Sequence, residues 1–241
     1  RDRRLLPGAH APQDGVLLVK HRFLAHDPDA QSLTIFFAGW GSSPERFRDL
    51  RPASGQDLFL LWDFDGAVGA LPDLSRYETV DVVGWSLGVR IAADWVMESP
   101  VPVRRFTAVA GTLTPIDRRL GISPLVFDRT TDGFNEETLQ GFLFNMTGSD
   151  EAARALRESE RTLESLGQEL RLLRDTYREA PFEGDLRTRV ETVCAFLPGA
   201  DRIVPAAAQE RAWGALSVTP VRTGEPHWCP EALQRAIHGE V

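Results

Sequence analysis

The sequence predicts an α/β fold, with a mostly parallel sheet, helices on both faces and a helical cap inserted between two strands. Apolar, β-branched runs alternate with segments of helical length along much of the chain, which is typical of parallel sheets. One of these runs stops at a Gly-x-Ser-x-Gly pentapeptide, at residues 84–88, and a helix-like segment follows at once. Residues 112–183 contain no convincing strand, and they are the predicted cap.

The predicted strands are short apolar runs bounded by turn residues. They cover residues 16–23, 33–37, 58–62, 80–83, 106–110, 190–197 and 216–221. Continuous runs such as 33–37 suit strands that are covered on both faces. With 241 residues, 42% of them hydrophobic, the chain can form one sizeable core. We therefore predict one domain over residues 16–241, preceded by a disordered or linker-like segment at 1–15.

The cap, at about residues 112–183, is predicted to hold two or three helices. Apolar side chains at i, i+3, i+4 and i+7 define one of them, at Leu139, Phe142, Leu143 and Met146. Ser149, followed by two acidic residues, is typical of a helix start. A leucine stripe then continues to Leu173, with Gly167 as a candidate break. An ordinary long crossover between two strands is the alternative interpretation of this segment.

Charge and composition argue against several classes of protein. The net charge of −8, from 27 Lys and Arg against 35 Asp and Glu, disfavours nucleic acid as the main partner. No apolar run has the length of a membrane span, and the first residues lack an apolar signal core. We therefore expect a cytoplasmic protein that does not bind membranes. The two cysteines, Cys194 and Cys229, have no spacing typical of a disulfide framework or a zinc site.

The pentapeptide gives Ser86 a distinctive setting. An apolar strand before it and an amphipathic segment after it, residues 89–97, make up the strand, sharp turn and helix of a nucleophile elbow. In such an elbow, which is typical of the α/β-hydrolase fold, the serine hydroxyl points out above the sheet. The pattern therefore predicts serine chemistry. A flexible glycine turn with a structural serine is the alternative.

A serine hydroxyl is a poor nucleophile near neutral pH and needs a base, which in turn needs an orienting carboxylate. In this fold the chain order is serine, acid, histidine. His227, after the last predicted strand, is the candidate base, because three of the five histidines precede Ser86 and His238 is predicted to be an exposed helix residue. Asp201, in the turn after strand 190–197, is the candidate acid. The alternatives are a plain loop histidine and a solvated pair of Asp201 with Arg202.

Two backbone N–H groups are needed to stabilise the oxyanion of a tetrahedral intermediate. One belongs to the residue after the nucleophile, here Leu87, and the other to a loop after an early strand. Residues 36–42 are that loop, and its glycines let the backbone approach the serine, so Trp40 is the second candidate donor. The indoles of Trp40, Trp85 and Trp228 are candidate walls of a pocket, with a place in the core as the alternative.

Several of these segments together resemble the BioG-type pimeloyl-acyl-carrier-protein methyl ester esterases. The resemblance runs from about residue 16 to the end. It rests on Phe37-Ala38-Gly39-Trp40-Gly41, the elbow at 84–88, Gly111-Thr112-Leu113-Thr114-Pro115-Ile116-Asp117, Gly121-Ile122, Thr130 and Phe134. It implies an α/β-hydrolase fold, a triad at Ser86, Asp201 and His227, an oxyanion hole at Trp40 and Leu87, and a role in making the pimelate moiety of biotin. Neither a metal nor an organic cofactor is needed.

The expected reaction is hydrolysis of the methyl ester of a pimeloyl group carried by acyl carrier protein. Because the carrier is acidic, it should dock where arginines outnumber carboxylates. Residues 104–129 are such a region, and Arg118, Arg119 and Arg129, with Trp85 inside the pocket, are the candidate substrate and carrier contacts. A solvated surface pair is the alternative interpretation of these arginines. The competing functions are an acyl thioesterase, a general short-chain carboxylesterase and a catalytically silent binding module.

Overall fold

A computed structural model describes residues 19–66, 71–157 and 161–240 of the chain. Its centre is a seven-stranded sheet, counted over these residues. The strands are β1 (Lys20–Ala25), β2 (Ser32–Phe37), β3 (Gln56–Trp62), β4 (Thr79–Trp85), β5 (Val103–Val109), β6 (Val190–Pro198) and β7 (Val221–Thr223). Their order across the sheet is β1-β3-β2-β4-β5-β6-β7. This is the predicted α/β fold with a mostly parallel sheet, because only the edge strand β1 runs antiparallel to its neighbour.

The register of the central strands brings the loops that follow them together. Phe37, at the end of β2, pairs with Leu61 of β3 and with Gly84 of β4. Trp85, at the end of β4, pairs with Val109 of β5. In a parallel sheet the carboxyl ends of neighbouring strands lie at one edge. The loop after β2 and the turn after β4 therefore lie side by side at that edge.

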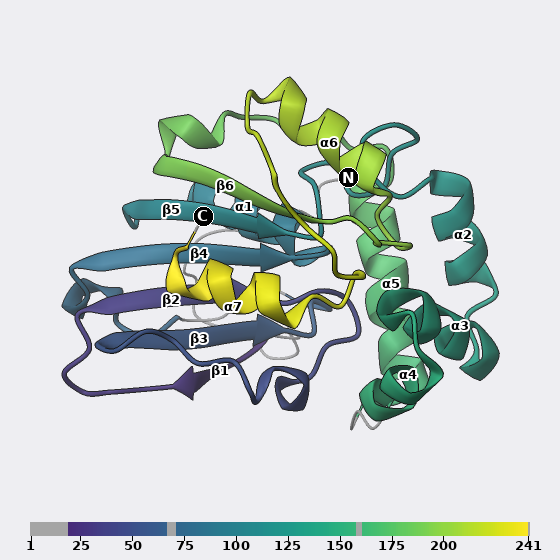
Figure 1. The fold of residues 1–241 in the computed structure, drawn as a ribbon, viewed down its shortest axis with the longest axis horizontal. Coiled ribbons are helices and arrows are strands. Elements are labelled where there is room, and N and C mark those ends of the chain that lie inside the picture. The colour runs from purple at the N-terminus through teal and green to yellow at the C-terminus, as the bar shows by residue number, and fades with distance from the viewer. Residues whose placement is uncertain (1–18, 67–70, 158–160, 241) are drawn as a thin grey trace.

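Helices cover both faces of the sheet, as predicted. α1 (Gly88–Glu98) lies behind the sheet and α7 (Pro230–His238) in front of it, and α6 (Ala206–Ala215) packs beside β6 (Figure 1). α1 begins directly after the elbow, and most of its side chains are buried. α7 ends with His238, which is exposed as predicted. Short 3-10 turns, η1 (Pro44–Phe47), η2 (Leu74–Arg76) and η3 (Leu186–Thr188), complete the connections.

Between β5 and β6, the structure places the four helices α2 (Pro124–Asp132), α3 (Glu136–Thr147), α4 (Asp150–Arg157) and α5 (Leu163–Tyr177) within the described residues. Two or three had been predicted from the sequence, so that number is too small. Gly167 does not break α5, which runs through it with Phe134 packed close by. We call α2–α5 the helical cap. It stacks against the end of the sheet at which β2 to β5 finish (Figure 1).

Every strand differs from its predicted range at one end or both, and the largest differences are at the predicted strands 216–221 and 16–23. The strand predicted at 216–221 is wrong over most of its length, because Leu216 caps α6 and Ser217 turns the chain with a φ of 57°. Pro220 follows, and only Val221–Thr223 pairs with β6. For the strand predicted at 16–23, β1 covers Lys20–Ala25, and residues 16–18 lie outside the described residues, as does the segment 1–15 that is predicted to be disordered. None of the helices in the described ranges combines the length and apolar character needed to cross a bilayer.

Candidate active site

Ser86 occupies the sharp turn between β4 and α1, as the pentapeptide predicts. Its φ of 58° lies in the left-handed region, which residues other than glycine seldom adopt. Its backbone N–H donates to the Val109 carbonyl oxygen at 2.9 Å, which fixes the turn against β5. A Cβ at Gly88 would overlap the Ala38 carbonyl oxygen, so only glycine lets the start of α1 approach the loop after β2. The elbow is therefore strained and closely packed.

His227 and Asp201 meet Ser86 from the far end of the chain. The His227 Nε2 atom lies 2.9 Å from the Ser86 Oγ atom, and the His227 Nδ1 atom lies 2.8 Å from an Asp201 carboxylate oxygen, Oδ2. The side chain of His227 is 1% exposed and that of Asp201 is fully buried. Pairing of β6 with β7 brings together the loops that carry these two residues. The structure thus joins the three predicted side chains in one buried hydrogen-bonded chain.

Further hydrogen bonds fix the Asp201 carboxylate. Its Oδ1 atom accepts the backbone N–H groups of Ile203 at 2.8 Å and Val204 at 2.9 Å. Its Oδ2 atom accepts the side-chain amide of Gln209 at 2.9 Å, besides its contact with His227. With Oδ2 as an acceptor, the Nδ1 atom of His227 carries the proton and the Nε2 atom is left to accept the serine hydroxyl. The alternative, a solvated pair with Arg202, is not formed in the structure, because Arg202 faces a cavity instead.

A cavity of about 300 Å³ opens beside Ser86 and His227. The core contributes Trp40, Trp85 and Leu87 to its walls, and the helical cap contributes mainly apolar side chains, among them Phe127, Phe142, Met146 and Leu170. Thr130, Thr138, Asn145 and Arg202 add a few polar groups. An apolar cavity with few polar groups is the usual form of a small-molecule site, and this one suits an aliphatic chain.

The three candidate tryptophans differ in position. Trp85 lines the cavity, and its indole donates to the His227 carbonyl oxygen at 3.1 Å. Trp40 also lines it. Trp228 does not appear in its wall and packs instead against Trp85, with ring centroids 5.4 Å apart, and against Phe47. Trp228 is therefore a partly buried residue packed against the core, outside the cavity wall.

The loop after β2 lies directly against Ser86. A Cβ at Gly39 would come within 2.9 Å of the Ser86 Cβ atom, which is too close for any larger residue without a shift. Within the described part of the chain, neither the Trp40 nor the Leu87 backbone N–H donates a hydrogen bond. Both residues line the same cavity as Ser86. These two N–H groups are therefore available to a bound oxygen.

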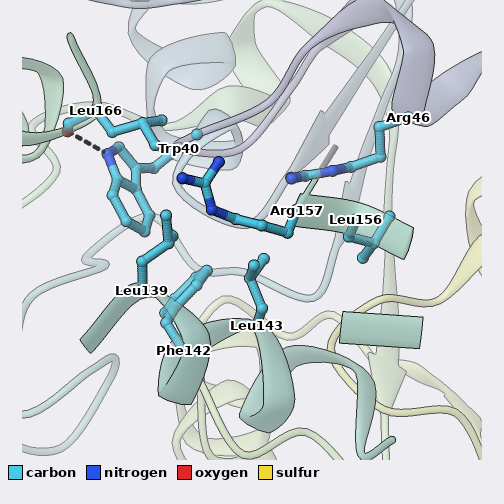
Figure 2. A pocket seen from close by; sticks show the side chains of 9 residues that line it. Trp40, Arg46, Leu139, Phe142, Leu143, Leu156, Arg157 and Leu166 are labelled. Atoms are coloured by element: carbon cyan, nitrogen blue, oxygen red, sulfur yellow. Dashed lines mark hydrogen bonds between the residues drawn. The ribbon is translucent and has the colours of Figure 1, made fainter. Parts of the chain in front are cut away.

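On its other side Trp40 faces the helical cap. Figure 2 shows its indole N–H directed at the Leu166 carbonyl oxygen of α5, 2.9 Å away. The space between this loop and α3 is a small cavity of about 10 Å³, about enough for one water molecule. Arg46 and Arg157 also border it (Figure 2). Burial lowers the pKa of Arg46 to about 10, and the nearby Arg161 charge acts in the same direction.

The predicted carrier contacts lie outside the cavity. Arg118 and Arg119 are exposed in the turn before α2, and Arg129 is exposed on α2. None of the three lines the cavity beside Ser86. Arg202 does line it, although no sequence pattern marks this arginine as a site residue. The sequence feature that could have identified Arg202 is its position directly after Asp201, in the loop that supplies the acid.

Glu169 is a second residue that the sequence analysis missed. It lies on α5 with no exposed surface, and its carboxylate accepts the backbone N–H of Gly41 at 3.1 Å. The available signal was a carboxylate three residues after Leu166, within the apolar stripe that ends at Leu173. Among the described residues, no three His, Cys, Asp or Glu side chains form a group that could hold a metal ion.

Comparison with known proteins identifies the family. The model of the family described as "Pimeloyl-ACP methyl esterase BioG" matches residues 19–227. The chain belongs to this family. A malonyl-[acyl-carrier protein] O-methyltransferase of Bacteroides fragilis (strain 638R) is 34% identical over 188 residues, which are 77% of this chain and 37% of that protein. An uncharacterized protein of Haemophilus influenzae is 32% identical over 113 residues, which are 47% of this chain and 51% of that protein.

Solved structures agree with the family and the fold. The crystal structure of BioG from Haemophilus influenzae has a TM-score of 0.78 at 25% identity, and covers 89% of this chain and 96% of that one. An esterase from Exiguobacterium antarcticum has a TM-score of 0.66 at 13% identity, and the match covers 91% of this chain and 96% of that one. The latter likeness shows the fold alone. This BioG family member therefore has an α/β-hydrolase fold.

Proposed function

We propose that this chain is a serine carboxylesterase that hydrolyses the methyl ester of pimeloyl-acyl carrier protein, giving free pimeloyl-acyl carrier protein and methanol for the synthesis of biotin. The observation that carries the proposal is the buried chain of hydrogen bonds from Ser86 through His227 to Asp201, at the wall of an apolar cavity. Membership of the BioG family supports the substrate. A malonyl-carrier methyltransferase name on one relative is consistent with methyl esters on carrier-bound acids.

In the first half of the reaction, the His227 Nε2 atom takes the hydroxyl proton as the Ser86 Oγ atom attacks the ester carbonyl carbon. The carbonyl electrons move onto the oxygen, and the Trp40 and Leu87 N–H groups donate to this oxyanion. When the carbonyl re-forms, the bond to the methoxy oxygen breaks and His227 returns the proton to it. Methanol leaves, and the acyl group stays on Ser86.

In the second half, water repeats the sequence against the acyl-enzyme. His227 takes a proton from the water molecule as its oxygen attacks the acyl carbon, and then returns a proton to Oγ as the ester to Ser86 breaks. The product is a carboxylate on the carrier-bound chain. Asp201 keeps His227 in one tautomer and stabilises the imidazolium that forms in each half.

The lining of the cavity supports an aliphatic acyl substrate. Its apolar walls from the helical cap suit the methylene chain, and the polar groups, including Arg202, suit the thioester end that leads to the carrier. We retain Arg118, Arg119 and Arg129 as proposed contacts of the acidic carrier outside the cavity, since all three are exposed.

An acyl thioesterase and a general short-chain carboxylesterase would use the same three side chains. Methanol release with the thioester intact, and a preference for carrier-bound over small nitrophenyl esters, distinguishes the proposed activity from both. A catalytically silent binding module is the third candidate. It is tested by labelling the wild type and Ser86→Ala with a fluorophosphonate probe, which reacts with activated serines. We expect labelling of the wild type alone; equal labelling would contradict serine catalysis at this position.

A further inference from the structure

The cap helix α5 carries a carboxylate that is wholly enclosed by the core. Glu169 has no exposed surface and lies on the buried side of α5, with Leu166, Leu170 and Leu173. Its Oε2 atom accepts the Gly41 backbone N–H at 3.1 Å, and its Oε1 atom accepts the Phe64 backbone N–H at 3.0 Å. Gly41 belongs to the loop after β2, and Phe64 to the loop after β3. One side chain of the cap thus bonds to two loops of the core.

Charges around Glu169 balance within the cluster. The Arg161 guanidinium donates to Glu169 at 2.6 Å and also to Asp63, whose second oxygen lies 2.7 Å from the Lys20 ammonium. Burial nevertheless raises the pKa of Glu169, against the opposing effect of Arg161. Enclosing a carboxylate in this way costs free energy, and a buried ion pair is weak support for stability. What Glu169 supplies in return is two fixed acceptors for backbone N–H groups.

Two hydrogen bonds to the same helix, α5, hold Trp40 in place. Its indole donates to the Leu166 carbonyl oxygen (Figure 2), and the peptide N–H that follows it, on Gly41, donates to Glu169. Leu166 and Glu169 are three residues apart and therefore face the loop from the same side of α5. With its side chain and the following peptide fixed, the direction of the Trp40 backbone N–H is fixed as well. On the far side of the loop, Gly39 packs against Ser86.

We infer that Glu169 is a positioning residue, which holds the Trp40 backbone N–H in the orientation that receives the oxyanion. The inference deepens the proposed function and rests on it, because it takes Trp40 as an oxyanion donor. Preorganised donors act mainly on the transition state, so their displacement lowers kcat more than it changes KM. The helical cap would then complete the catalytic site as well as cover it.

A purely structural role is the competing explanation, and the chain offers a matched control. Asp57, at the start of β3, is also fully buried, and it also accepts a backbone N–H, that of Asp27, at 2.7 Å. It pairs with an arginine too, Arg76, at 2.8 Å. It lies at the end of β3 away from Ser86, so Asp57→Asn disturbs a comparable buried cluster without touching the loop after β2.

The experiment compares Glu169→Gln, Glu169→Asp and Asp57→Asn with the wild type. Glutamine presents an NH2 group to one of the donors, and aspartate keeps the charge beside Arg161 but is one methylene shorter. Three quantities are measured for folded protein: kcat and KM on p-nitrophenyl butyrate, the Ki of an alkylboronic acid that forms a tetrahedral adduct with serine, and hydrogen exchange of the Gly41 and Phe64 amides, which donate to Glu169.

For both Glu169 variants we expect kcat to fall by about 10- to 100-fold with KM within about threefold, because a displaced oxyanion donor loses most of its effect. The Ki of the boronic acid should rise by a similar factor, and the two amides should exchange faster. Asp57→Asn should keep its kcat, its Ki and the exchange of these amides. If Glu169→Gln does not fold, the same measurements on Glu169→Asp decide whether Glu169 is a positioning residue.

The inference is overturned if the Glu169 variants match Asp57→Asn in kcat and Ki while the wild type is active and depends on Ser86. That result would leave the proposed function intact. A wild type without esterase activity would instead reject the proposed function. The amide exchange then still reports on the two loops, and unchanged protection of Gly41 and Phe64 in the Glu169 variants would reject the positioning role as well.

Discussion

At the level of single residues, the atom of Asp201 that contacts His227 determines which nitrogen of the His227 ring carries the proton. Oδ1 is occupied by two backbone N–H groups, and Oδ2 faces the His227 Nδ1 atom. In Asp201→Asn the amide oxygen should keep the two backbone hydrogen bonds, which turns the NH2 group towards His227. The imidazole must then accept at Nδ1 and carry its proton on Nε2, where it can no longer accept the Ser86 hydroxyl.

We therefore expect Asp201→Asn to fold normally and to lose activity by about 10,000-fold in kcat, the size of effect known for a wrong tautomer in serine hydrolases. Steady-state kinetics on a nitrophenyl ester measures it. Asp185→Asn, which alters an exposed aspartate at the start of η3, is the control and should keep full activity. An Asp201→Asn variant within tenfold of the wild type would show that another group orients His227.

The sequence suffices for Ser86, His227 and Asp201, because each follows a strand and their chain order is diagnostic of the fold. It does not suffice for Glu169. The partners of that carboxylate, Gly41 and Phe64, lie 128 and 105 residues away along the chain. Its burial depends on how the helical cap docks against the sheet. Arg202 was missed for a related reason, since its direction into the cavity is set by the course of the loop.

At the element scale, α3 contains a glycine that its surroundings do not require. A Cβ at Gly141 would meet no atom within 4 Å, and α3 has regular caps, with Asn135 at its start and Gly148 at its end. Glycine inside a helix is less favourable than alanine by about 0.5–1 kcal/mol. The opposite case is Gly88, where a Cβ would overlap the Ala38 carbonyl oxygen.

Gly141→Ala is therefore expected to raise the free energy of unfolding by about 0.5–1 kcal/mol. Gly88→Ala, the matched substitution at a crowded site, should lower it by about 1–3 kcal/mol. Chemical denaturation of both variants beside the wild type provides the comparison. Equal shifts in the two variants would contradict the packing described for α1 and α3.

Local patterns predicted most of the strands, but they failed for α2 and for the strand at 216–221, among others. α2 was not predicted, because Leu125 and Val126 are exposed on it and leave no apolar stripe at helical spacing. The apolar residues Leu216 and Val218 looked like a strand, yet they pack on the core from the turn that ends α6. In both cases tertiary contacts outweigh the apolar pattern, which alone cannot separate a strand from a packed turn.

At the scale of the whole molecule, a net charge of −8 makes docking of an acidic carrier unfavourable except at local basic patches. Arg118 and Arg119 are exposed beside the helical cap. We expect the double variant Arg118→Glu, Arg119→Glu to raise KM for the carrier-bound ester by roughly 5- to 10-fold, because charges at the rim of an interface steer association. KM for a free methyl ester should not change.

The control for this variant is Arg187→Glu, whose side chain is 57% exposed on η3, at the beginning of β6. It should leave KM for both substrates as in the wild type. An equal rise for the carrier-bound and the free ester in the Arg118, Arg119 variant would reject these residues as carrier contacts. Loss of the effect of the double variant at high salt would support an electrostatic origin.

Global stability should depend on pH through Asp57. Burial raises the pKa of this carboxyl, but hydrogen bonds from Tyr77, the Asp27 backbone and His26 outweigh it, and the pKa lies below its usual value of 3.8. A folded pKa below the unfolded one stabilises the protein above the usual value, and the stabilisation is lost as the pH falls through the lower value.

Asp57→Asn should accordingly cost about 1–3 kcal/mol of unfolding free energy at neutral pH, the usual effect of leaving buried donors unsatisfied. The difference from the wild type should shrink as the pH falls below about 4. Urea denaturation from neutral pH to below the usual pKa of the carboxyl tests this. A difference that stays constant over that range would mean that the charge of Asp57 does not contribute.

If Ser86 cleaves a methyl ester on a carrier-bound acyl chain, pimeloyl-acyl carrier protein methyl ester is the substrate that decides the proposed activity. Methanol release and the mass of the carrier are followed for the wild type and for Ser86→Ala. We expect the proposed activity to give one methanol for each carrier, a mass loss of one methylene with the thioester intact, and a rate at least about 1,000-fold lower for Ser86→Ala. Release of the free carrier without methanol, or equal rates for the two proteins, would contradict it.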